Sequence, residues 1–567
     1  MRNNPRETTM KKNILGALLP FSAILLTAAC GGEVIGGPAL ASVPDDLAAL
    51  VPPNTTLYIQ LDSLDSLDES QALFTSEFGE QAAFRPVLDQ MLGEVMDVDL
   101  IDTTRPIGVT IDLSSAMSGP PIVAFVVPVR DTDGFLGSLS GPDPSAAAVE
   151  GTYVGVPISP GYVRGEETSP LTDSLLAGDL SVRADLAAII EVFDPMIQDG
   201  IEQMGMEFDD PQMTALAVGM EIAPILDLYV DGFQSFMDSA ETLDLALEAD
   251  GSQLGLRMAF TVAEGSELAE FAAGATSGVR DVAGYVDQDS AIVFLMGLDS
   301  GAMYDSMQPY MDTIFGIYPE VMRDSLMAYM DSYQEIMHLL DGGMAGSMDI
   351  QPGGMRFSYY MASDDTEAVI AKMTEMFNSD MLDFMGEASE PETLEIGGLT
   401  VMRSRIDFGN MVAALSTETE VDATELEAMN DMMATIYGPD GLQMAFAASD
   451  GVIAFIGGGD EDYLRKACAN LERGPMELSA DLERALSSVE GGRMSFVMRM
   501  DFARYMGGTI AMMSSMPGMP PAGSVPDLSG QSANILMHGV VDGLVWRGGI
   551  SVDLKEISAF ASAMGDL

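Results

Sequence analysis

The chain has 567 residues, enough for two to four domains of about 150 residues each, so a sizeable core is expected. It carries 25 Lys and Arg against 88 Asp and Glu, a net charge of −63, yet 47% of its residues are hydrophobic. The apolar fraction excludes a disordered chain, and the acidic field, with basic residues scattered singly, excludes nucleic-acid binding.

A secretory signal is predicted at the N-terminus. Residues 10–30 read MKKNILGALLPFSAILLTAAC, with two lysines, an apolar run from Ile14 to Leu26, and small residues before a cysteine. The run is too short for a stable membrane span and is typical of a cleaved signal peptide. We therefore expect a signal peptide over residues 1–29, with Met10 as an alternative start, and a flexible tether over residues 30–43.

The last five residues of that segment, Leu26-Thr27-Ala28-Ala29-Cys30, resemble the lipobox of bacterial lipoproteins. The resemblance implies that Cys30 becomes the N-terminus of the mature protein and carries fatty acyl chains such as palmitate. In that family a residue other than Asp after the cysteine, here Gly31, implies the outer membrane of a Gram-negative cell. The alternative is an ordinary cleaved signal with an incidental cysteine.

Four pairs of similar segments recur in the same order along the body. Each pair shares a strand, an acidic helix cap with an amphipathic helix, or a hairpin that turns at Asp-Gly. The pairs are 51–61 with 286–296, 122–139 with 356–373, 182–187 with 498–503, and 243–273 with 535–563. Their separations of 235, 234, 316 and 292 positions indicate insertions. We predict two related α+β halves, residues 44–276 and 277–567, each an antiparallel sheet with helices packed on one face.

The insertions differ between the halves. In the first half we expect helix over residues 185–239, broken near Pro211. In the second half we expect a helical run over residues 303–340 that is interrupted at Pro319, helices over residues 366–385 and 425–437, and a loop from Gly507 to Gly530.

Together, VPPNTTLYIQLDSLDSL at 51–67, PIVAFVVPVRDTDGFLGSL at 121–139, AGDLSVRADLAAII at 177–190 and the late hairpin resemble a family of bacterial envelope lipoproteins classed as a domain of unknown function. The resemblance spreads over most of the mature chain. It implies a place in the cell envelope, and it carries over no activity and no functional residues.

Methionine is unusually frequent, with 45 residues. Thioethers suit Cu(I), and a Pro/Gly-rich segment places Met513, Met516 and Met519 at three-residue spacing, so these are weak candidates for soft-metal ligands. The alternative is that Met fills the core in place of Leu. A third interpretation lies between them, in which Met-rich helices line a pliable cavity for a lipid or another hydrophobic ligand.

Catalytic motifs are missing from the sequence. We find no G-x-S-x-G, H-E-x-x-H or Walker loop, and the two histidines, His338 and His538, stand in no recognisable site. Asp131-Thr132-Asp133-Gly134 starts like a calcium loop but lacks the later acidic ligands, so Asp131 is expected to cap a helix. Cys468 has no partner for a disulfide and is expected to be a small buried hydrophobe.

These observations predict a lipid-anchored envelope protein with a non-enzymatic binding or structural role and no cofactor. The alternatives are a carrier of a hydrophobic ligand and a Met-based copper binder. Removing residues 1–29 takes away Arg2, Arg6, Lys11 and Lys12 together with Glu7, so the mature charge becomes −66. A surface this acidic repels itself, which favours a saline habitat, because the Debye length falls from about 10 Å at 0.1 M salt to about 3 Å at 1 M.

Overall fold

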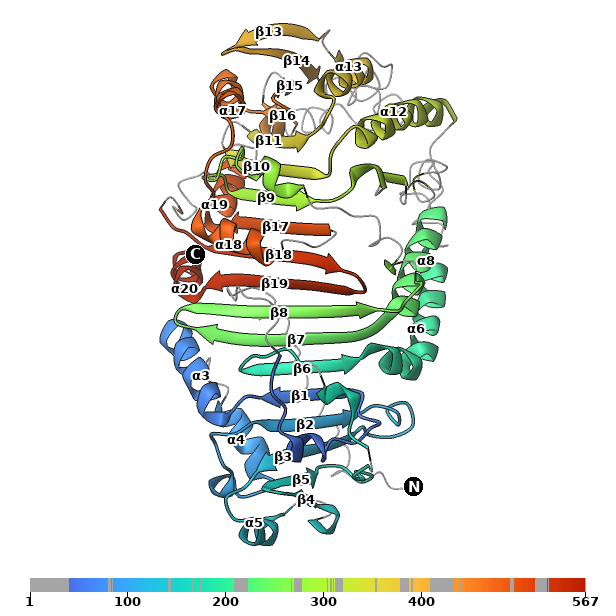
Figure 1. The fold of residues 1–567 in the computed structure, drawn as a ribbon, viewed down its shortest axis with the longest axis vertical. Coiled ribbons are helices and arrows are strands. Elements are labelled where there is room, and N and C mark those ends of the chain that lie inside the picture. The colour runs from blue at the N-terminus through green and yellow to red at the C-terminus, as the bar shows by residue number, and fades with distance from the viewer. Residues whose placement is uncertain are drawn as a thin grey trace. The chain divides into compact units, whose positions relative to one another are not determined.

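The computed structural model describes residues 40–565, with breaks of one to four residues and longer gaps at 209–222, 270–277, 312–319, 378–386, 408–432 and 515–527. Helices and antiparallel strands make up the described chain, which confirms the α+β class (Figure 1). Two compact units are present, and neither is contiguous in sequence as the predicted halves are. Unit 1 comprises Met1–Asp199, Met237–Glu264 and Val545–Ser558, and unit 2 comprises Gly200–Phe236, Gly265–Leu544 and Ala559–Leu567.

Unit 1 contains one antiparallel sheet. Its strands follow the order β4 (Ala148–Glu150), β5 (Tyr153–Pro157), β3 (Ile122–Pro128), β2 (Ile107–Asp112), β1 (Leu57–Leu61), β6 (Leu180–Asp185), β7 (Ala240–Asp250), β8 (Gln253–Val262) and β19 (Val545–Asp553). The β7–β8 hairpin turns at Asp250-Gly251, as predicted, and Gly251 adopts a φ of 62° that a side chain would disfavour.

Different helices cover the two faces of this sheet. Helices α3 (Leu64–Phe78), α4 (Arg85–Gly93) and α5 (Thr132–Ser138) bury Leu64, Leu92 and Phe135 in a core that includes Leu61 and Val127 from the strands. The short helices α2 (Asp45–Ala48) and η4 (Pro170–Thr172) close a smaller core on the other face. Two helices, α6 (Leu186–Phe208) and α8 (Ala223–Ser239), run from one unit into the other.

Unit 2 is also built from antiparallel strands. Its strands follow the order β18 (Asn534–Asp542), β17 (Met494–Asp501), β9 (Ile292–Gly297), β10 (Gly343–Gln351), β11 (Gly354–Ala362), β16 (Val452–Gly458), β15 (Leu442–Ser449) and β14 (Leu399–Asp407). β13 (Glu392–Ile396) and β12 (Glu387–Ala388) both pair with β14.

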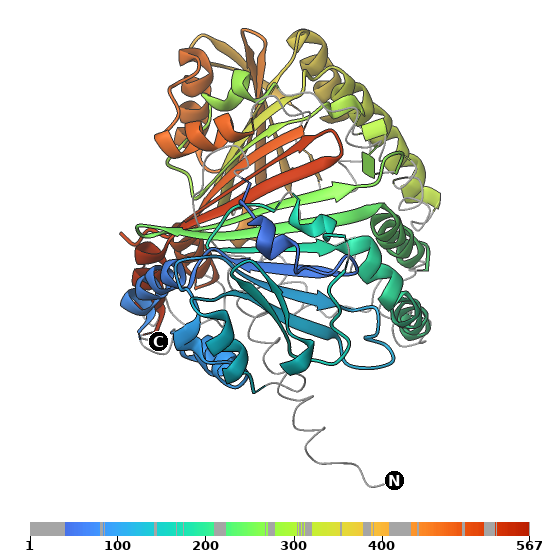
Figure 2. The same ribbon diagram turned by 60° about the horizontal axis from the view of Figure 1, so that its bottom comes forward.

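Helices cover both faces of the unit 2 sheet, so the prediction that helices pack on one face is wrong for this unit. α10 (Val279–Ala283), α17 (Glu461–Arg473) and α18 (Ala480–Ser488) pack with Ala454 of β16. α12 (Glu320–His338) and α13 (Thr366–Phe377) pack with Ile453, which points to the opposite face because neighbouring residues alternate along a strand. Figure 2 shows orange helices on one side of these strands and olive helices on the other.

The first strand of each unit is flanked by two strands in the same arrangement. β1 lies between β2 and β6, and Leu57 is opposite Ile111 and Ala184. β9 lies between β10 and β17, and Ile292 is opposite Met348 and Met500.

The next strands outward also match in register. In unit 1, Ile111 is opposite Val123 and Ala184 is opposite Leu243. In unit 2, Met348 is opposite Phe357 and Met500 is opposite Ile535.

Helix caps follow the sequence analysis closely. Asp131 accepts a hydrogen bond from Gly134 N, Asp185 from Ala188 N, and Asp501 from Arg504 N. These contacts satisfy amide groups that a helix start leaves unpaired, so they explain why α5, α6 and α19 (Phe502–Met513) begin where they do.

Other predicted elements agree in part. α6 and α8 fall within the predicted helical region 185–239, and α12 begins directly after Pro319. Most of the helix predicted at 425–437 lies outside the described residues. The predicted loop at 507–530 is corrected at its start, because α19 continues to Met513 through two glycines.

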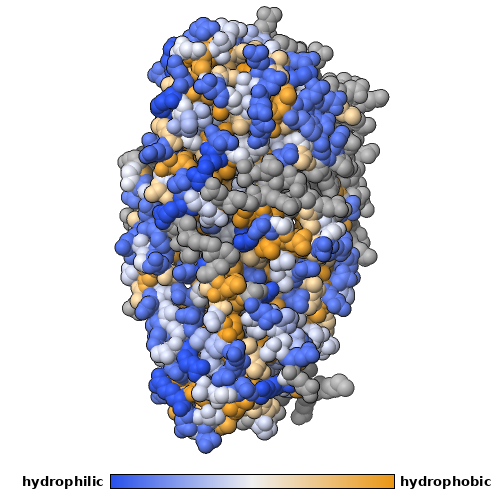
Figure 3. Space-filling model, viewed as in Figure 1, coloured by the Kyte–Doolittle hydropathy of each residue, from blue (hydrophilic) through white to orange (hydrophobic). Residues whose placement is uncertain are grey.

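Hydrophilic residues cover much of the visible face, with orange apolar patches between them (Figure 3). No helix in the described part of the chain has both the length and the apolar character to cross a bilayer.

Candidate functional site

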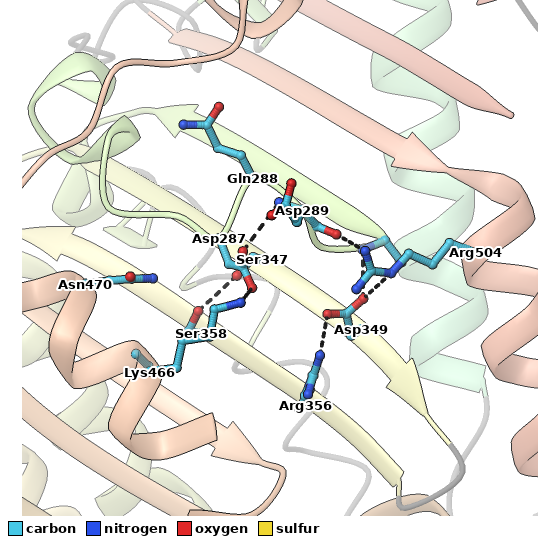
Figure 4. A network of polar contacts seen from close by, with 12 residues as sticks. Asp287, Gln288, Asp289, Ser347, Asp349, Arg356, Ser358, Lys466, Asn470 and Arg504 are labelled. Carbon is cyan, nitrogen blue, oxygen red and sulfur yellow. Dashed lines mark hydrogen bonds and ion pairs between the residues drawn. The ribbon is translucent and has the colours of Figure 1, made fainter. Parts of the chain in front are cut away.

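Unit 2 contains a cluster of charged side chains around the turn that precedes β9. Asp349, near the end of β10, is 2% exposed and accepts a hydrogen bond from Ala291 N at 2.9 Å. Its carboxylate also contacts Arg356 Nη2 at 3.1 Å and Arg504 Nε at 3.0 Å (Figure 4). Arg356 is directly opposite on β11, whereas Arg504 comes from the first turn of α19. Both carboxylate oxygens are therefore engaged, Oδ2 by the neighbouring strand and Oδ1 by groups distant in sequence.

The same turn is held from its other side. Lys466 Nζ lies 2.5 Å from Asp287 Oδ2, and the Gln288 side chain donates to Glu477 O at 2.9 Å and accepts from Ser479 N at 2.7 Å. Arg499 donates to the carbonyl of Gln288, and Arg504 donates to the carbonyl of Asp289. We call this group the Asp349 cluster; it comprises Asp287, Gln288, Asp289, Asp349, Arg356, Lys466, Arg499 and Arg504.

The Asp349 cluster takes four of only 25 basic residues in a strongly acidic chain. The Arg356 guanidinium also lies 5.0 Å from the centre of the Tyr463 ring, and burial raises the pKa of Tyr463 to about 12. Because these groups are engaged with one another, they hold the turn against β10 and α19. The role that this arrangement supports is structural.

A second candidate is a groove of about 590 Å³ between α12 and α13. Leu339, Ala368 and Ala371 provide its apolar surface, and Glu335, His338, Lys372 and Glu375 complete its lining. Lys372 Nζ lies 2.5 Å from Glu335 and 3.1 Å from Glu375, and these contacts raise the pKa of Lys372. His338 Nε2 lies 3.0 Å from Asp305 Oδ1.

Below this groove is a core cluster rich in methionine. Ile336 from α12 and Val369 from α13 are buried in it. Its buried methionines come from α13 and from two strands, and they are Met361, Met373, Met376 and Met444. These residues match the interpretation of methionine as a core filler.

Of the predicted site residues, Met513 is the one within the described part of the chain. Cys30, Met516 and Met519 lie outside the described residues, whereas Met513 is 40% exposed at the end of α19. Within the described ranges, no group of three or more His, Cys, Asp or Glu side chains is placed to hold a metal ion.

Cys468 is buried, as predicted, with 1% exposure in the core beneath α17, and burial raises the pKa of its thiol to about 11. His538 lies on β18, where burial lowers its pKa, and its Nδ1 finds no hydrogen-bond partner among the described residues.

Sequence reasoning missed the Asp349 cluster and the groove. The cluster joins residues between 287 and 504, and each of its members looks like an ordinary polar surface residue in sequence. The one available signal was the scarcity of basic residues, which makes each Arg or Lys worth tracing to a partner.

No protein-family model and no curated protein matches the chain. Two solved structures, titled "Structure of crystal form III of TP0453" and "Structure of crystal form I of TP0453", are 8% identical to it, each with a TM-score of 0.23. They cover 50% of this chain and 98% and 97% of their own chains, respectively. A likeness of this size carries no argument about fold or function.

Proposed function

We propose that the chain is an exported lipoprotein, anchored through Cys30 to the outer membrane of a Gram-negative bacterium, with a non-enzymatic binding or structural role in the envelope. The observation that carries this proposal is the signal ending at Leu26-Thr27-Ala28-Ala29-Cys30. Several acyl chains on one cysteine give stable anchoring, because each buried methylene contributes about 0.8 kcal/mol.

Labelling with radioactive palmitate in a Gram-negative host tests the anchor. The wild-type protein is expected to carry label and to sediment with outer membranes, whereas Cys30→Ala is expected to lose both properties. Cys468→Ala is the matched control, because that thiol is 1% exposed and should leave the label unchanged. Label that persists in Cys30→Ala would overturn the proposal.

We also infer that the body arose by duplication of one α+β half. The strand registers support this inference. Leu57 and Ile292 are 235 positions apart, and the residues paired with them two strands away, Val123 and Phe357, are 234 apart. These separations equal those of the first two pairs of similar sequence segments.

The strands on the other side of β1 and β9 extend the correspondence. Ala184 and Met500 are 316 positions apart, and their partners Leu243 and Ile535 are 292 apart, again equal to the sequence separations.

Each half also places a buried aspartate at the same register position. Asp112 is 5% exposed on β2 and accepts from Asn54 in the turn before β1, as Asp349 accepts from Ala291 before β9.

A second candidate function is a carrier of a lipid or another hydrophobic ligand. The groove between α12 and α13 favours it, since its volume of about 590 Å³ falls in the range of small-molecule sites and methionines lie beneath it. Mass spectrometry of an organic extract of the native protein is expected to reveal a bound amphiphile at about one molecule per chain. An extract without such a molecule would contradict the carrier role and leave the anchor proposal intact.

A further inference from the structure

The charged groups that line the groove between α12 and α13 are not balanced, because negative groups outnumber positive ones. Lys372 on α13 is bound between two carboxylates, Glu335 from α12 and Glu375 from its own helix. Two acids therefore share one ammonium group. Asp305 adds a third carboxylate beside His338 at the same helix end.

In unit 1, the described residues at the corresponding place make direct contacts. There, α4 precedes β2 and α5 follows β3, just as α12 precedes β10 and α13 follows β11. The segments after α4 and α5 are joined directly, because Ser140 N donates to Val95 O at 2.9 Å and Ser140 Oγ donates to Glu94 O at 3.1 Å. The shared strand order is therefore accompanied by direct hydrogen bonds in unit 1 and by the groove in unit 2.

The wall and floor of the groove combine two kinds of surface. Leu339, Ala368 and Ala371 offer short apolar side chains that leave room for a hydrocarbon. Met373 lies in the core beneath, and its flexible thioether lets the floor adapt to the shape of a ligand.

We propose that this groove binds an amphiphilic organic cation. Its alkyl part covers Leu339, Ala368 and Ala371, and its ammonium group takes the place of Lys372 Nζ between Glu335 and Glu375. The excess of carboxylates at the groove and the net charge of −63 both favour a cation and oppose a fatty acid or an anionic lipid. This inference rests on the carrier role proposed above and names its site and ligand class.

Calorimetric titration with decylammonium tests the proposal, using the full chain with Cys30→Ser to remove the acylation site. About 0.5 M salt screens the exposed acidic surface, since the Debye length is then only a few ångströms. We expect one site per chain for decylammonium and no binding of decanoate, which has the same chain length and the opposite charge. Equal affinity for the two probes, or the absence of decylammonium binding, overturns the proposal.

Variants locate the site. Glu335→Gln with Glu375→Gln is expected to weaken decylammonium binding by about tenfold, because the double variant removes both carboxylates that hold the ammonium group. Asp364→Asn with Glu367→Gln is the matched control, since both residues are exposed near the start of α13 and outside the groove lining. Equal weakening by the two double variants would mean that only the total charge matters, and it would contradict the proposal.

Ala371→Trp gives a second measurement that does not depend on charge. Ala371 is exposed, so a larger side chain should fill the groove without disturbing the core. We expect this variant to keep its unfolding midpoint and to lose decylammonium binding. Unchanged binding in Ala371→Trp would place the site elsewhere and overturn the proposal. Co-purification of a native amphiphile in that case would preserve the carrier role with a different site.

Discussion

At the scale of single residues, Asp349 is a buried carboxylate that contacts several elements of unit 2. It joins β10 to the turn before β9, to β11 and to α19 through one carboxylate. Removing one partner of a buried ion pair is costly because the remaining charges are left in a poorly solvated place.

Asp349→Asn should therefore destabilise unit 2 by about 3 kcal/mol. The unfolding midpoint in urea, followed by circular dichroism, measures this loss, and hydrogen exchange at the Ala291 amide localises it. Asp364→Asn, at an exposed site, serves as control. A midpoint equal to that of the control would show that the Asp349 contacts do not stabilise the fold.

For Asp244 on β7, the effect of burial on the carboxyl group outweighs that of the nearby positive charge. Its side chain is 7% exposed, and Arg183 Nε is 3.6 Å away on β6. Desolvation by burial raises the pKa of Asp244 to about 6, and the Arg183 charge lowers it only in part. Because the folded state holds the proton more tightly than the unfolded state, this group favours folding at acidic pH. That contribution is lost as the pH rises from about 4 through 6.

Relative to wild type, Asp244→Asn should gain about 2 kcal/mol of unfolding free energy between pH about 4 and pH about 7. Urea denaturation of both proteins across this range gives the difference. Asp250→Asn, at the exposed β7–β8 turn, is the control for removing an acidic side chain from the same hairpin. A flat difference for Asp244→Asn would mean that Arg183 fully compensates the burial.

At the scale of elements, a row of aromatic rings crosses the unit 2 sheet. Tyr359 on β11 lies 5.4 Å from Phe294 on β9 and 6.0 Å from Phe455 on β16, measured between ring centres. Gly346 on β10 lies between the first two, and a Cβ there would meet Phe294 at 2.2 Å and Tyr359 at 2.6 Å. The absence of a side chain at residue 346 is what brings the two rings together.

Gly346→Val should destabilise unit 2 by about 1–3 kcal/mol, because the rings must leave their packed positions. Thermal unfolding measures the effect. Gly137→Val is a useful control, since a Cβ at that helix position meets no atom within 4 Å. Equal losses of stability in Gly346→Val and Gly137→Val would show that a side chain at residue 346 does not crowd the two rings.

Secondary-structure elements could be predicted where they depend on residues close in sequence. They could not be predicted where they depend on tertiary packing. The Asp caps of α5, α6 and α19 and the turn at Asp250-Gly251 were predictable, because each depends on residues a few positions apart. The packing of α12 and α13 was not predictable. Helical periodicity indicates that a helix has an apolar face, and it does not say which side of a sheet that face meets.

The loop prediction failed for a related reason. Gly507 and Gly508 suggested an irregular segment, yet both lie within α19. A Cβ at Gly508 would lie 2.1 Å from Ile350 O of β10, so this glycine permits close helix-to-strand packing. Tertiary contact here outweighs the low helix propensity of glycine, about 1 kcal/mol.

At the scale of the whole molecule, charge is the dominant property. The 88 acidic residues outnumber the 25 basic residues by more than three to one, so the negative charges of the chain repel one another. Self-repulsion of this kind destabilises a compact state and weakens as salt is added.

The unfolding temperature should therefore rise by several degrees between about 0.05 M and about 2 M sodium chloride. Potassium chloride at equal ionic strength should act alike, because screening depends on ion concentration. An unfolding temperature that does not change with salt would contradict both the repulsion and the saline habitat expected from composition.

The assembly of unit 1 from separate stretches has a consequence for synthesis. β8 is complete at Val262, but its outer neighbour β19 begins at Val545, so residues 263–544 must be translated first. Until then, a strand of ten residues presents unpaired backbone groups to any other extended chain. Folding of the first unit thus waits for translation of β19, which favours delivery of the chain in an unfolded, protected state and makes premature termination before residue 545 a direct route to aggregation.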